Sequence, residues 1–357
     1  MAYFKTMPLD RSRFQTTLDS LATDLFFLSH GKMCVAVTNY GARVVAIQVP
    51  DRTGKLVDIA VGYNRIADYI NNPEAYYGAT IGRVGNRIAD GRFTLDGVVY
   101  KLVQNDGLHT LHGGKTGLHS VVWNVKEHSD TQLVLSHASP AGTDSFPGNV
   151  EITLSYTLTH NHDLQIRYRA ITDAPTILNL TNHTYFNLNG EGTGSTLQHT
   201  LQLQAERYTP VTAALIPTGE LRPVEGSPFD FRTPKAIGAQ ITDKNTQLEI
   251  GNGYDHNFIT SDKPTPSLRK IAAVVGDQSG IQLEVHTQEP GVQLYTGNFM
   301  NGQQLLKSGA RDDKQTAFCL ETQHFPDSPN YTHFPSIRLD PGQEYRSCTV
   351  YRFGITE

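Results

Sequence analysis

Apolar and polar residues alternate with a period of two in many segments of the chain. Successive side chains of a strand point to opposite faces, so this alternation is typical of strands with one buried face. It predicts strands near both ends of the chain, within 33–50 and 344–355, and in many segments between them. Residues that favour turns bound most of these segments. The pattern therefore indicates a mainly β chain.

Three pairs of alternating segments predict β-hairpins. Residues 93–102 carry Asp96 and Gly97 between two arms, and Asp-Gly supplies the positive φ angles that a two-residue hairpin turn needs. Residues 154–170 and 271–287 each place a polar segment between two alternating arms. We expect the arms of each pair to form antiparallel strands.

Helical patterns are scarce, and we expect only one or two turns of helix within 65–76 and another within 303–307. The chain has no alternation of strands with helices, no linker, no block of charge and no internal repeat. Amphipathic strands in this number need a second sheet to bury their apolar faces. We therefore expect one large antiparallel β-sandwich, an all-β domain over 1–357 in which 1–25 stay unassigned.

Composition and charge narrow the class of protein. Of the 357 residues, 38 % are hydrophobic and 18 % charged, which suits a chain that buries a core. A net charge of -5 argues against binding to nucleic acid. The sequence has no apolar run of the ~18 residues that cross a membrane, and its start lacks the apolar core of a signal peptide. We expect a soluble, cytoplasmic protein with no nucleic-acid or membrane partner.

The three cysteines fit a reducing compartment. They are odd in number, far apart and without the CxxC spacing of redox or metal motifs; they are Cys34, Cys319 and Cys348.

Six segments are denser in polar and aromatic side chains than turns require. They are GRVGNRI at 82–88, HTLHGG at 109–114, NLTNHTYFNL at 179–188, YDHNF at 254–258, GVQLYTGN at 291–298 and CLETQHFPDSPN at 319–330. We interpret them as the parts of the chain that carry its chemistry.

Single residues of these segments also have ordinary structural interpretations. Ionised carboxylates are rarely buried without a partner or a function, so Glu321, within AFCLETQHF, is a candidate for chemistry on its own. His183 alone is more often a hydrogen-bonded structural residue, and His112 alone would mark a turn before two glycines. Asp255 fits an Asx turn equally well. Arg87 fits a surface salt bridge.

Together, in this order and spacing, the six segments closely resemble the aldose 1-epimerase (galactose mutarotase) family. The resemblance runs from about Tyr40 to Phe353, and six ordered motifs are far more specific than one. It implies the galactose mutarotase-like β-sandwich. Gly85 stands where many relatives have alanine, and Tyr331 where histidine is common, but neither matches a catalytic position.

The resemblance implies interconversion of the α and β anomers of free aldohexoses such as galactose and glucose. A base removes the proton of the C1 hydroxyl while an acid protonates the ring oxygen, and the open aldehyde rotates about C1–C2 before the ring closes again. By position in their motifs, Glu321 matches the base, His183 the acid, and His112 a second catalytic histidine beside the ring oxygen. We expect apolar neighbours such as Phe318 to raise the pKa of Glu321, and a charged imidazole to lower it.

The same resemblance implies a set of sugar-binding residues. Sugar hydroxyls donate and accept hydrogen bonds at once, which suits a mixture of carboxylate, amide and guanidinium partners. The matching positions are Asn86, Arg87, Asp255 and Gln293. Stacking of aromatic rings on the apolar face of the sugar is a further hypothesis, with Tyr185, Phe186 or Phe258 as candidates. The implied partner is a monosaccharide, with no cofactor and no metal, and the chain is expected to act as a monomer or homodimer.

Three other functions share parts of the pattern. A hexose-6-phosphate 1-epimerase would need additional basic residues to hold the phosphate. A sugar-binding module without catalysis would not need both His183 and Glu321. A glycoside hydrolase would need two carboxylates that flank the scissile bond, and Asp255 is the only other strong candidate beside Glu321.

Metal and nucleotide motifs are weak in this sequence. Structural zinc sites need four ligands, and the His109/His112 and His160/His162 pairs have no companion ligands at convincing spacing. The glycine-rich segments GEGTGS and GNGYDH do not fit the dinucleotide-binding pattern.

Overall fold

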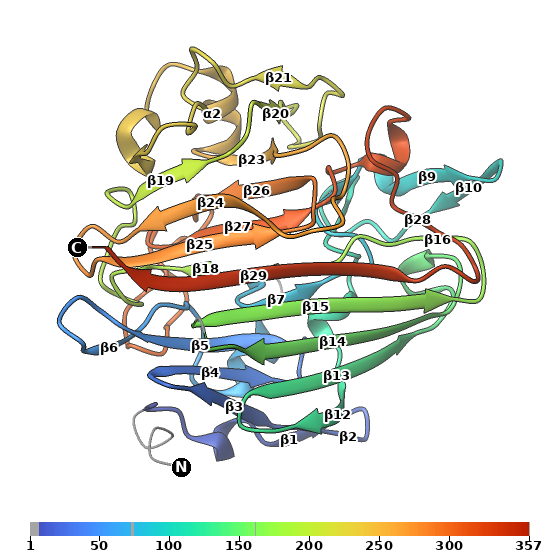
Figure 1. Cartoon of the computed structure of the whole chain (residues 1–357). Coiled ribbons are helices and arrows are strands. Elements are labelled where there is room, and N and C mark those ends of the chain that lie inside the picture. Colours follow the sequence, from blue (N-terminus) through green and yellow to red (C-terminus); the bar gives the residue numbers. More distant parts are fainter. Residues whose placement is uncertain (1–6, 73–74, 161, 357) are drawn as a thin grey trace.

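The chain is almost entirely β-structure. The computed structural model describes residues 7–72, 75–160 and 162–356 (Figure 1). Within these ranges the α-helices are two short ones, α1 (Ile66–Asn71) and α2 (Thr246–Gly251). In that part of the chain neither helix has the length and apolar character of a membrane span. The predicted all-β class is confirmed.

One layer of the sandwich is a nine-stranded sheet whose neighbouring strands are all antiparallel. In spatial order its strands are β12 (Asn124–His128), β13 (Gln132–Ser139), β14 (Val150–Leu158), β15 (Asp163–Thr172), β29 (Tyr345–Ile355), β25 (Ile281–Thr287), β24 (Arg269–Val275), β19 (Thr200–Leu203) and β22 (Lys235–Ala236).

Two smaller antiparallel sheets form the facing layer. The six-stranded sheet contains, in order, β18 (Tyr185–Phe186), β27 (Phe318–Gln323), β26 (Gly291–Tyr295), β23 (Asp255–Ile259), β20 (Arg207–Thr209) and β21 (Arg222–Pro223). The four-stranded sheet contains β3 (Leu25–His30), β4 (Met33–Thr38), β5 (Arg43–Pro50) and β6 (Leu56–Asp58).

Short two-stranded pairs complete the fold, and two of them border the site described below. Those two are β7 (Ala79–Ile81) with β17 (Thr181–His183), and β8 (Arg87–Ile88) with β11 (Thr110–Leu111). The others are β1 (Thr16–Leu18) with β2 (Leu21–Thr23), β9 (Arg92–Leu95) with β10 (Val98–Lys101), and β16 (Thr176–Ile177) with β28 (Arg338–Leu339).

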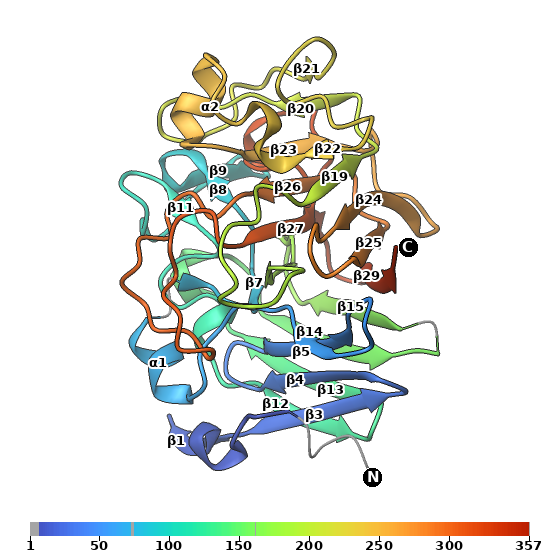
Figure 2. The same cartoon turned by 90° about the vertical axis from the view of Figure 1, so that its left-hand side faces the viewer.

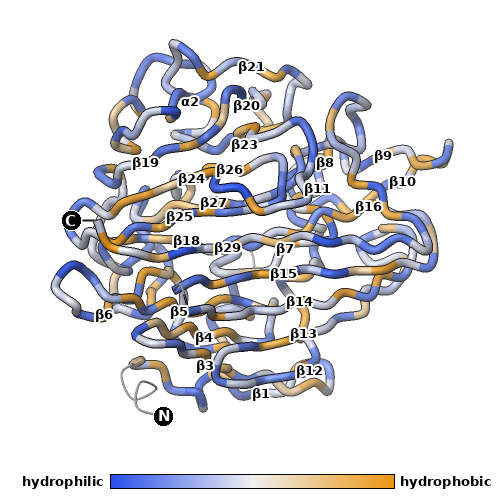
Figure 3. The backbone as a smooth tube through the Cα atoms, in the orientation of Figure 1, coloured by the Kyte–Doolittle hydropathy of each residue, from blue (hydrophilic) through white to orange (hydrophobic). Residues whose placement is uncertain are grey.

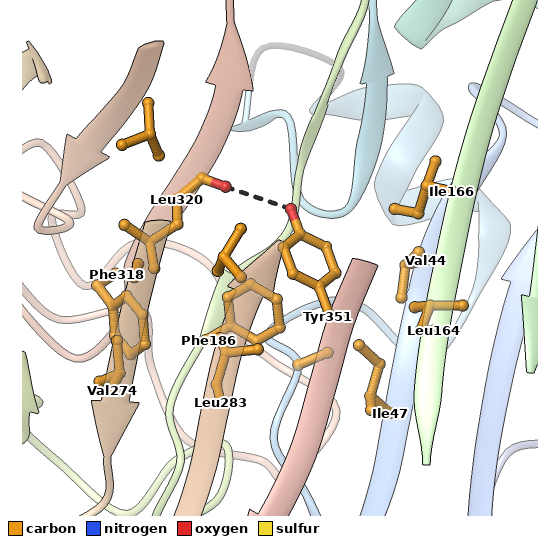
Figure 4. Packing of buried hydrophobic residues seen from close by; sticks show 14 of the residues in the cluster. Val44, Ile47, Leu164, Ile166, Phe186, Val274, Leu283, Phe318, Leu320 and Tyr351 are labelled. Atoms are coloured by element: carbon orange, nitrogen blue, oxygen red, sulfur yellow. Dashed lines mark hydrogen bonds between the residues drawn. The ribbon is translucent and has the colours of Figure 1, made fainter. Parts of the chain in front are cut away.

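The apolar face of each layer meets the other in one hydrophobic cluster. Along β14 buried residues alternate with exposed or partly exposed ones, as a half-buried strand requires, and Figure 3 shows apolar and polar residues alternating along such strands. In Figure 4 the side chains of β5 lie against those of β15, and those of β18 and β27 lie near those of β25 and β29. The hydroxyl of Tyr351 donates to the carbonyl of Leu320 at 3.2 Å across this interface. Residues of all three sheets belong to the cluster, which supports our proposal of a single domain.

Most of the local predictions are confirmed. The hairpin over 93–102 forms as β9 and β10, with φ of 51° at Asp96 and 76° at Gly97. The other two predicted hairpins are β14–β15 and β24–β25. The expected turn of helix within 65–76 is α1.

One helical prediction was wrong and one helix was missed. Residues 303–307 form an irregular segment instead of a helical turn, and the side chain of Lys307 at its end forms an ion pair with the buried Glu191. Helix α2 was not predicted, although Asn245 is a sequence signal for its start: the side chain accepts a hydrogen bond from the backbone N–H of Gln247, as an N-cap does.

Candidate active site

A cavity of about 670 Å³ opens on the side of the six-stranded sheet that faces away from the core. Figure 2 shows the sandwich edge-on, with β24, β25 and β29 to the right of β26 and β27, and with β8 and β11 to their left. Six of the seven residues that the sequence nominated line the cavity: Asn86, Arg87, His112, His183, Asp255 and Glu321. The seventh, Gln293, does not line the cavity, but its side chain donates a hydrogen bond to Asp255, which does. Segments far apart in the sequence therefore meet at one place.

Strand register explains why these segments converge. Glu321 on β27 pairs with Gln293 on β26, which pairs with Asn257 on β23. Two residues along each strand, Cys319, Tyr295 and Asp255 form the next row, to which Tyr185 on β18 is added. Residues two apart share one face of a strand. One face of three strands therefore supplies the floor of the cavity, while alternate residues such as Leu320 enter the core.

Glu321 and His183 face each other in the floor of the cavity. The Nε2 atom of His183 lies 3.6 Å from Oε1 of Glu321, and the two residues are 4 % and 2 % exposed. The other carboxylate oxygen, Oε2, has no hydrogen-bond partner among the described residues. A buried carboxylate oxygen without a partner is costly. Glu321 lines the cavity, so its carboxyl group is placed to contact a polar ligand there.

His112 offers a defined proton to the cavity. The backbone N–H of Asn86 donates to Nδ1 of His112 at 3.2 Å, so the neutral ring carries its proton on Nε2. Burial and the nearby His183 and Arg87 lower the pKa of His112 well below its usual value, which keeps the ring neutral. His112 is thereby suited to donate a hydrogen bond without changing charge.

Three residues at this end of the cavity have unusual backbone conformations. Tyr76, Asn86 and His112 have φ of 54°, 60° and 53°, in the left-handed region that side chains larger than glycine rarely adopt. Such outliers are concentrated at functional sites. The pairing of β8 with β11 brings two of them together, since the N–H of His112 donates to the carbonyl of Asn86 at 3.0 Å.

Burial shifts the pKa values of Glu321 and His183. It raises the pKa of Glu321 well above its usual value, and the nearby Asp255 adds to this while Arg87 opposes it. Burial also lowers the pKa of His183 to about 3. Both shifts favour the uncharged form of each group. The expectation that Phe318 desolvates Glu321 was wrong, because Phe318 lies on the opposite, core face of β27.

The three groups could also be considered as metal ligands. One ligand atom from each of His112, His183 and Glu321 lies within 4.8 Å of the others. Ligands of a tetrahedral zinc with bonds of about 2.1 Å are about 3.4 Å apart. The His183–Glu321 distance of 3.6 Å is close to this value, but three protein ligands are one fewer than a structural zinc site has.

Asp255, another residue that lines the cavity, is held by a hydrogen bond from Gln293. The amide nitrogen of Gln293 donates to Oδ1 of Asp255 at 2.7 Å, and Asp255 lines the cavity. Gln293 does not line it, so its contact is with Asp255. Arg87 forms the salt bridge that we considered, to Asp106 at 2.7 Å, and lines the cavity as well.

One of the three aromatic residues that we considered for stacking on the sugar lies at the cavity. Tyr185 lines the cavity. Phe186 and Phe258 are fully buried in the main hydrophobic cluster and do not line it. Phe186 is one residue from Tyr185 on the same strand, so its side chain points to the opposite face.

Sequence reasoning missed several residues of the cavity wall. Tyr295 had a signal, because it lies in the segment 291–298 that we singled out, two residues after Gln293. Tyr76, Tyr77 and Asp312 had none, since they come from irregular segments. The hydroxyl of Tyr77 donates to Asp312 at 3.0 Å, at the wall formed by the segment after β26.

Comparison with known proteins agrees with this geometry. The sequence model of the aldose 1-epimerase family matches residues 24–352. The chain belongs to the aldose 1-epimerase family. Among its relatives in this family, galactose mutarotase from Bos taurus is 40 % identical over 330 residues, 92 % of this chain and 94 % of that protein. Aldose 1-epimerase from Escherichia coli is 36 % identical over 324 residues, 90 % of this chain and 92 % of the relative.

Solved structures of the family share the fold. A GalM/aldose epimerase homologue from C. elegans superposes with a TM-score of 0.86 at 29 % identity, covering 94 % of this chain and 100 % of that one. Galactose 1-epimerase from Lactobacillus acidophilus gives a TM-score of 0.84 at 26 % identity, with 96 % and 97 % covered. The galactose mutarotase-like sandwich that the motifs implied is therefore confirmed.

Proposed function

We propose that this protein is an aldose 1-epimerase that interconverts the anomers of free aldohexoses such as galactose and glucose. The observation that carries the proposal is the buried His183–Glu321 pair at 3.6 Å, at the floor of a cavity large enough for a sugar. The reaction needs a base and an acid that act on opposite sides of C1 and the ring oxygen. Family membership supplies the reaction class.

In the proposed mechanism the pair starts as carboxylate and imidazolium. Glu321 accepts the proton of the C1 hydroxyl while His183 donates to the ring oxygen, and the ring opens. The pair is then uncharged, which is the state that burial favours in this cavity. After rotation about C1–C2, each group reverses its role and the ring closes as the other anomer. The protein environment thus favours the protonation state that accompanies the open-chain intermediate.

The remaining nominated residues act on the substrate's other polar atoms in this proposal. The Nε2–H of His112 donates to the sugar near the ring oxygen. Asp255, held by Gln293, and the Asn86–Arg87 edge bind sugar hydroxyls. The proposed chemistry uses no cofactor, and its partner is a monosaccharide.

Charge in the cavity disfavours a phosphorylated substrate. Among the described lining residues Arg87 is the only arginine or lysine, and Asp106 neutralises it. The same wall carries three carboxylates, Asp255, Asp312 and Glu321. A phosphate group would meet net repulsion here.

We also propose that the protein works in the cytoplasm, as a monomer or homodimer. The three cysteines are free and buried, which suits a reducing compartment. One chain supplies all the lining residues named here, so no second copy is needed to complete the cavity.

Polarimetry of freshly dissolved α-D-galactose tests the proposed function. We expect the wild-type protein to accelerate the change in rotation in the presence of a chelator, and Glu321→Gln and His183→Asn each to lower the rate about 10²- to 10⁴-fold. Glu284→Gln is a matched control, because Glu284 forms a carboxylate–histidine pair with His286 on β25, away from the cavity. Near-wild-type rates in both cavity variants, with circular dichroism unchanged, would refute the assignment.

A further inference from the structure

Two tyrosine rings lie nearly parallel to the imidazole of His183. The ring of Tyr185 has its centroid 4.9 Å from that of the imidazole, with 17° between the planes. The ring of Tyr76 lies at 5.8 Å and 18°. Both tyrosines are buried and line the cavity, and His183 itself is 4 % exposed, so the imidazole is largely shielded from bulk water.

Backbone pairing builds this arrangement. Tyr185 lies two residues beyond His183 in extended chain, so both side chains point the same way. In addition, β7 pairs with β17, and the N–H of Gly78 donates to the carbonyl of His183 at 3.0 Å. This places Tyr76, just before β7, beside the imidazole. The left-handed backbone of Tyr76 turns the ring into that position.

The charge that His183 takes up makes these contacts relevant to the reaction. The face of an aromatic ring is negative and attracts a cation whose centre lies within about 6 Å. Both tyrosines meet that distance. The other groups near His183 do not provide a parallel face: His112 and Tyr295 meet it at 80° and 76°. Arg43 is a nearby positive charge, whereas Glu321 is the acidic partner.

We propose that Tyr76 and Tyr185 are positioning residues that fix the plane of His183 and stabilise its imidazolium form through their ring faces. The inference rests on the proposed function, in which His183 is charged whenever the sugar ring is closed and ready to react. The two faces offset part of the cost of placing that charge in a buried cavity, and they keep Nε2 directed at Glu321. They act through His183 and transfer no proton.

Fluorinated phenylalanines provide the test, because fluorine reduces the negative electrostatic potential of the ring face while nearly keeping the shape of the ring. Tyr185 is replaced by phenylalanine and then by its mono-, di- and trifluoro derivatives, and a second series is made at Tyr76. The activity of each phenylalanine variant is the reference for its own series. Along each series kcat for galactose should then fall stepwise, about 2- to 30-fold in all, with KM nearly unchanged.

Phe186 serves as the matched control. It neighbours Tyr185 on β18, but its ring packs against Phe318 and Tyr351 in the core. The same fluorination at Phe186 should leave kcat unchanged. An active protein whose kcat stays flat along both tyrosine series would overturn the inference and leave the proposed function intact. A wild-type protein that does not accelerate mutarotation would instead overturn the proposed function.

Discussion

At the scale of single residues, burial determines the chemistry available to this site. His183 and Glu321 are ordinary titratable groups whose pKa values burial shifts in opposite directions, that of Glu321 upward and that of His183 downward, because each loses water on folding. A proton can then pass between the pair and a sugar without either group leaving its place. The neighbouring residues contribute by holding these groups and their partners in position.

Gln293 is expected to act through Asp255. Replacing it by leucine removes the 2.7 Å hydrogen bond to the carboxylate, and hydrogen bonds to charged groups contribute about 1.5–3 kcal/mol. We therefore expect Gln293→Leu to raise KM for galactose about 10-fold or more, measured by coupled oxidation of the β anomer. In an Asp255→Asn background the same change should add little, because both variants remove one interaction. Fully additive effects would show that Gln293 acts elsewhere.

A second residue-scale prediction concerns His256. Burial lowers its pKa to about 3, from 6.5 in an unfolded chain, so below pH 6.5 the unfolded state binds a proton that the folded state does not. The stability that His256 contributes is complete above pH 6.5 and is lost as pH falls toward 3.

His256→Gln removes this dependence. In urea titrations between pH 7 and 5, the wild type should lose about 1.4 kcal/mol per pH unit relative to the variant below pH 6.5. A stability difference between the two proteins that does not change with pH would contradict a neutral, buried His256.

At the scale of elements, the site depends on close contacts between loops that follow paired strands. After β11 the chain makes a left-handed turn through His112, Gly113 and Gly114, against the carbonyl of Gly82. The glycines in HTLHGG are therefore required for packing, and His112 owes its position to them. In isolation we had interpreted this segment as a turn, and it is both a turn and part of the cavity wall.

Gly113→Ala tests this contact. A Cβ atom there would lie 2.0 Å from the carbonyl oxygen of Gly82, and φ is 86°, so the backbone itself must move. We expect a loss of at least ~2 kcal/mol in the free energy of unfolding and a lower kcat, as His112 shifts. Gly107→Ala is the matched control, because it also has positive φ but no neighbour within 4 Å. Equal losses in both variants would show that backbone conformation alone, without the close contact, is responsible.

At the scale of the whole molecule, Lys307 joins the cavity wall to the four-stranded sheet. It lies on the segment between β26 and β27, and its ammonium contacts Glu191 at 2.8 Å and Asp58 of β6 at 3.2 Å. It also donates to the carbonyl of Val45 on β5 at 2.9 Å. A buried cation thereby fixes a segment that carries Asp312 and other lining residues.

Lys307→Met should be strongly destabilising, by about 3–5 kcal/mol, because it leaves two carboxylates without their cation. Thermal unfolding would measure the loss. Adding Glu191→Gln should recover part of it by removing one of the unpaired charges. If the double variant is less stable than Lys307→Met, the cation does not act through Glu191.

The sequence by itself determined the sandwich class, the main hairpins and the identity of the candidate residues. Period-two alternation and turn chemistry are local consequences of how strands bury one face, and ordered motifs carry their chemistry in short segments. Only the tertiary structure decided which face each residue joins and what lies beside it. It placed Phe186 and Phe258 in the core, joined Gln293 to Asp255 by a hydrogen bond, made 303–307 an irregular segment with Lys307 paired to Glu191, and set Tyr76 beside His183. Those outcomes depend on strand register and on burial by distant segments, which no local pattern encodes.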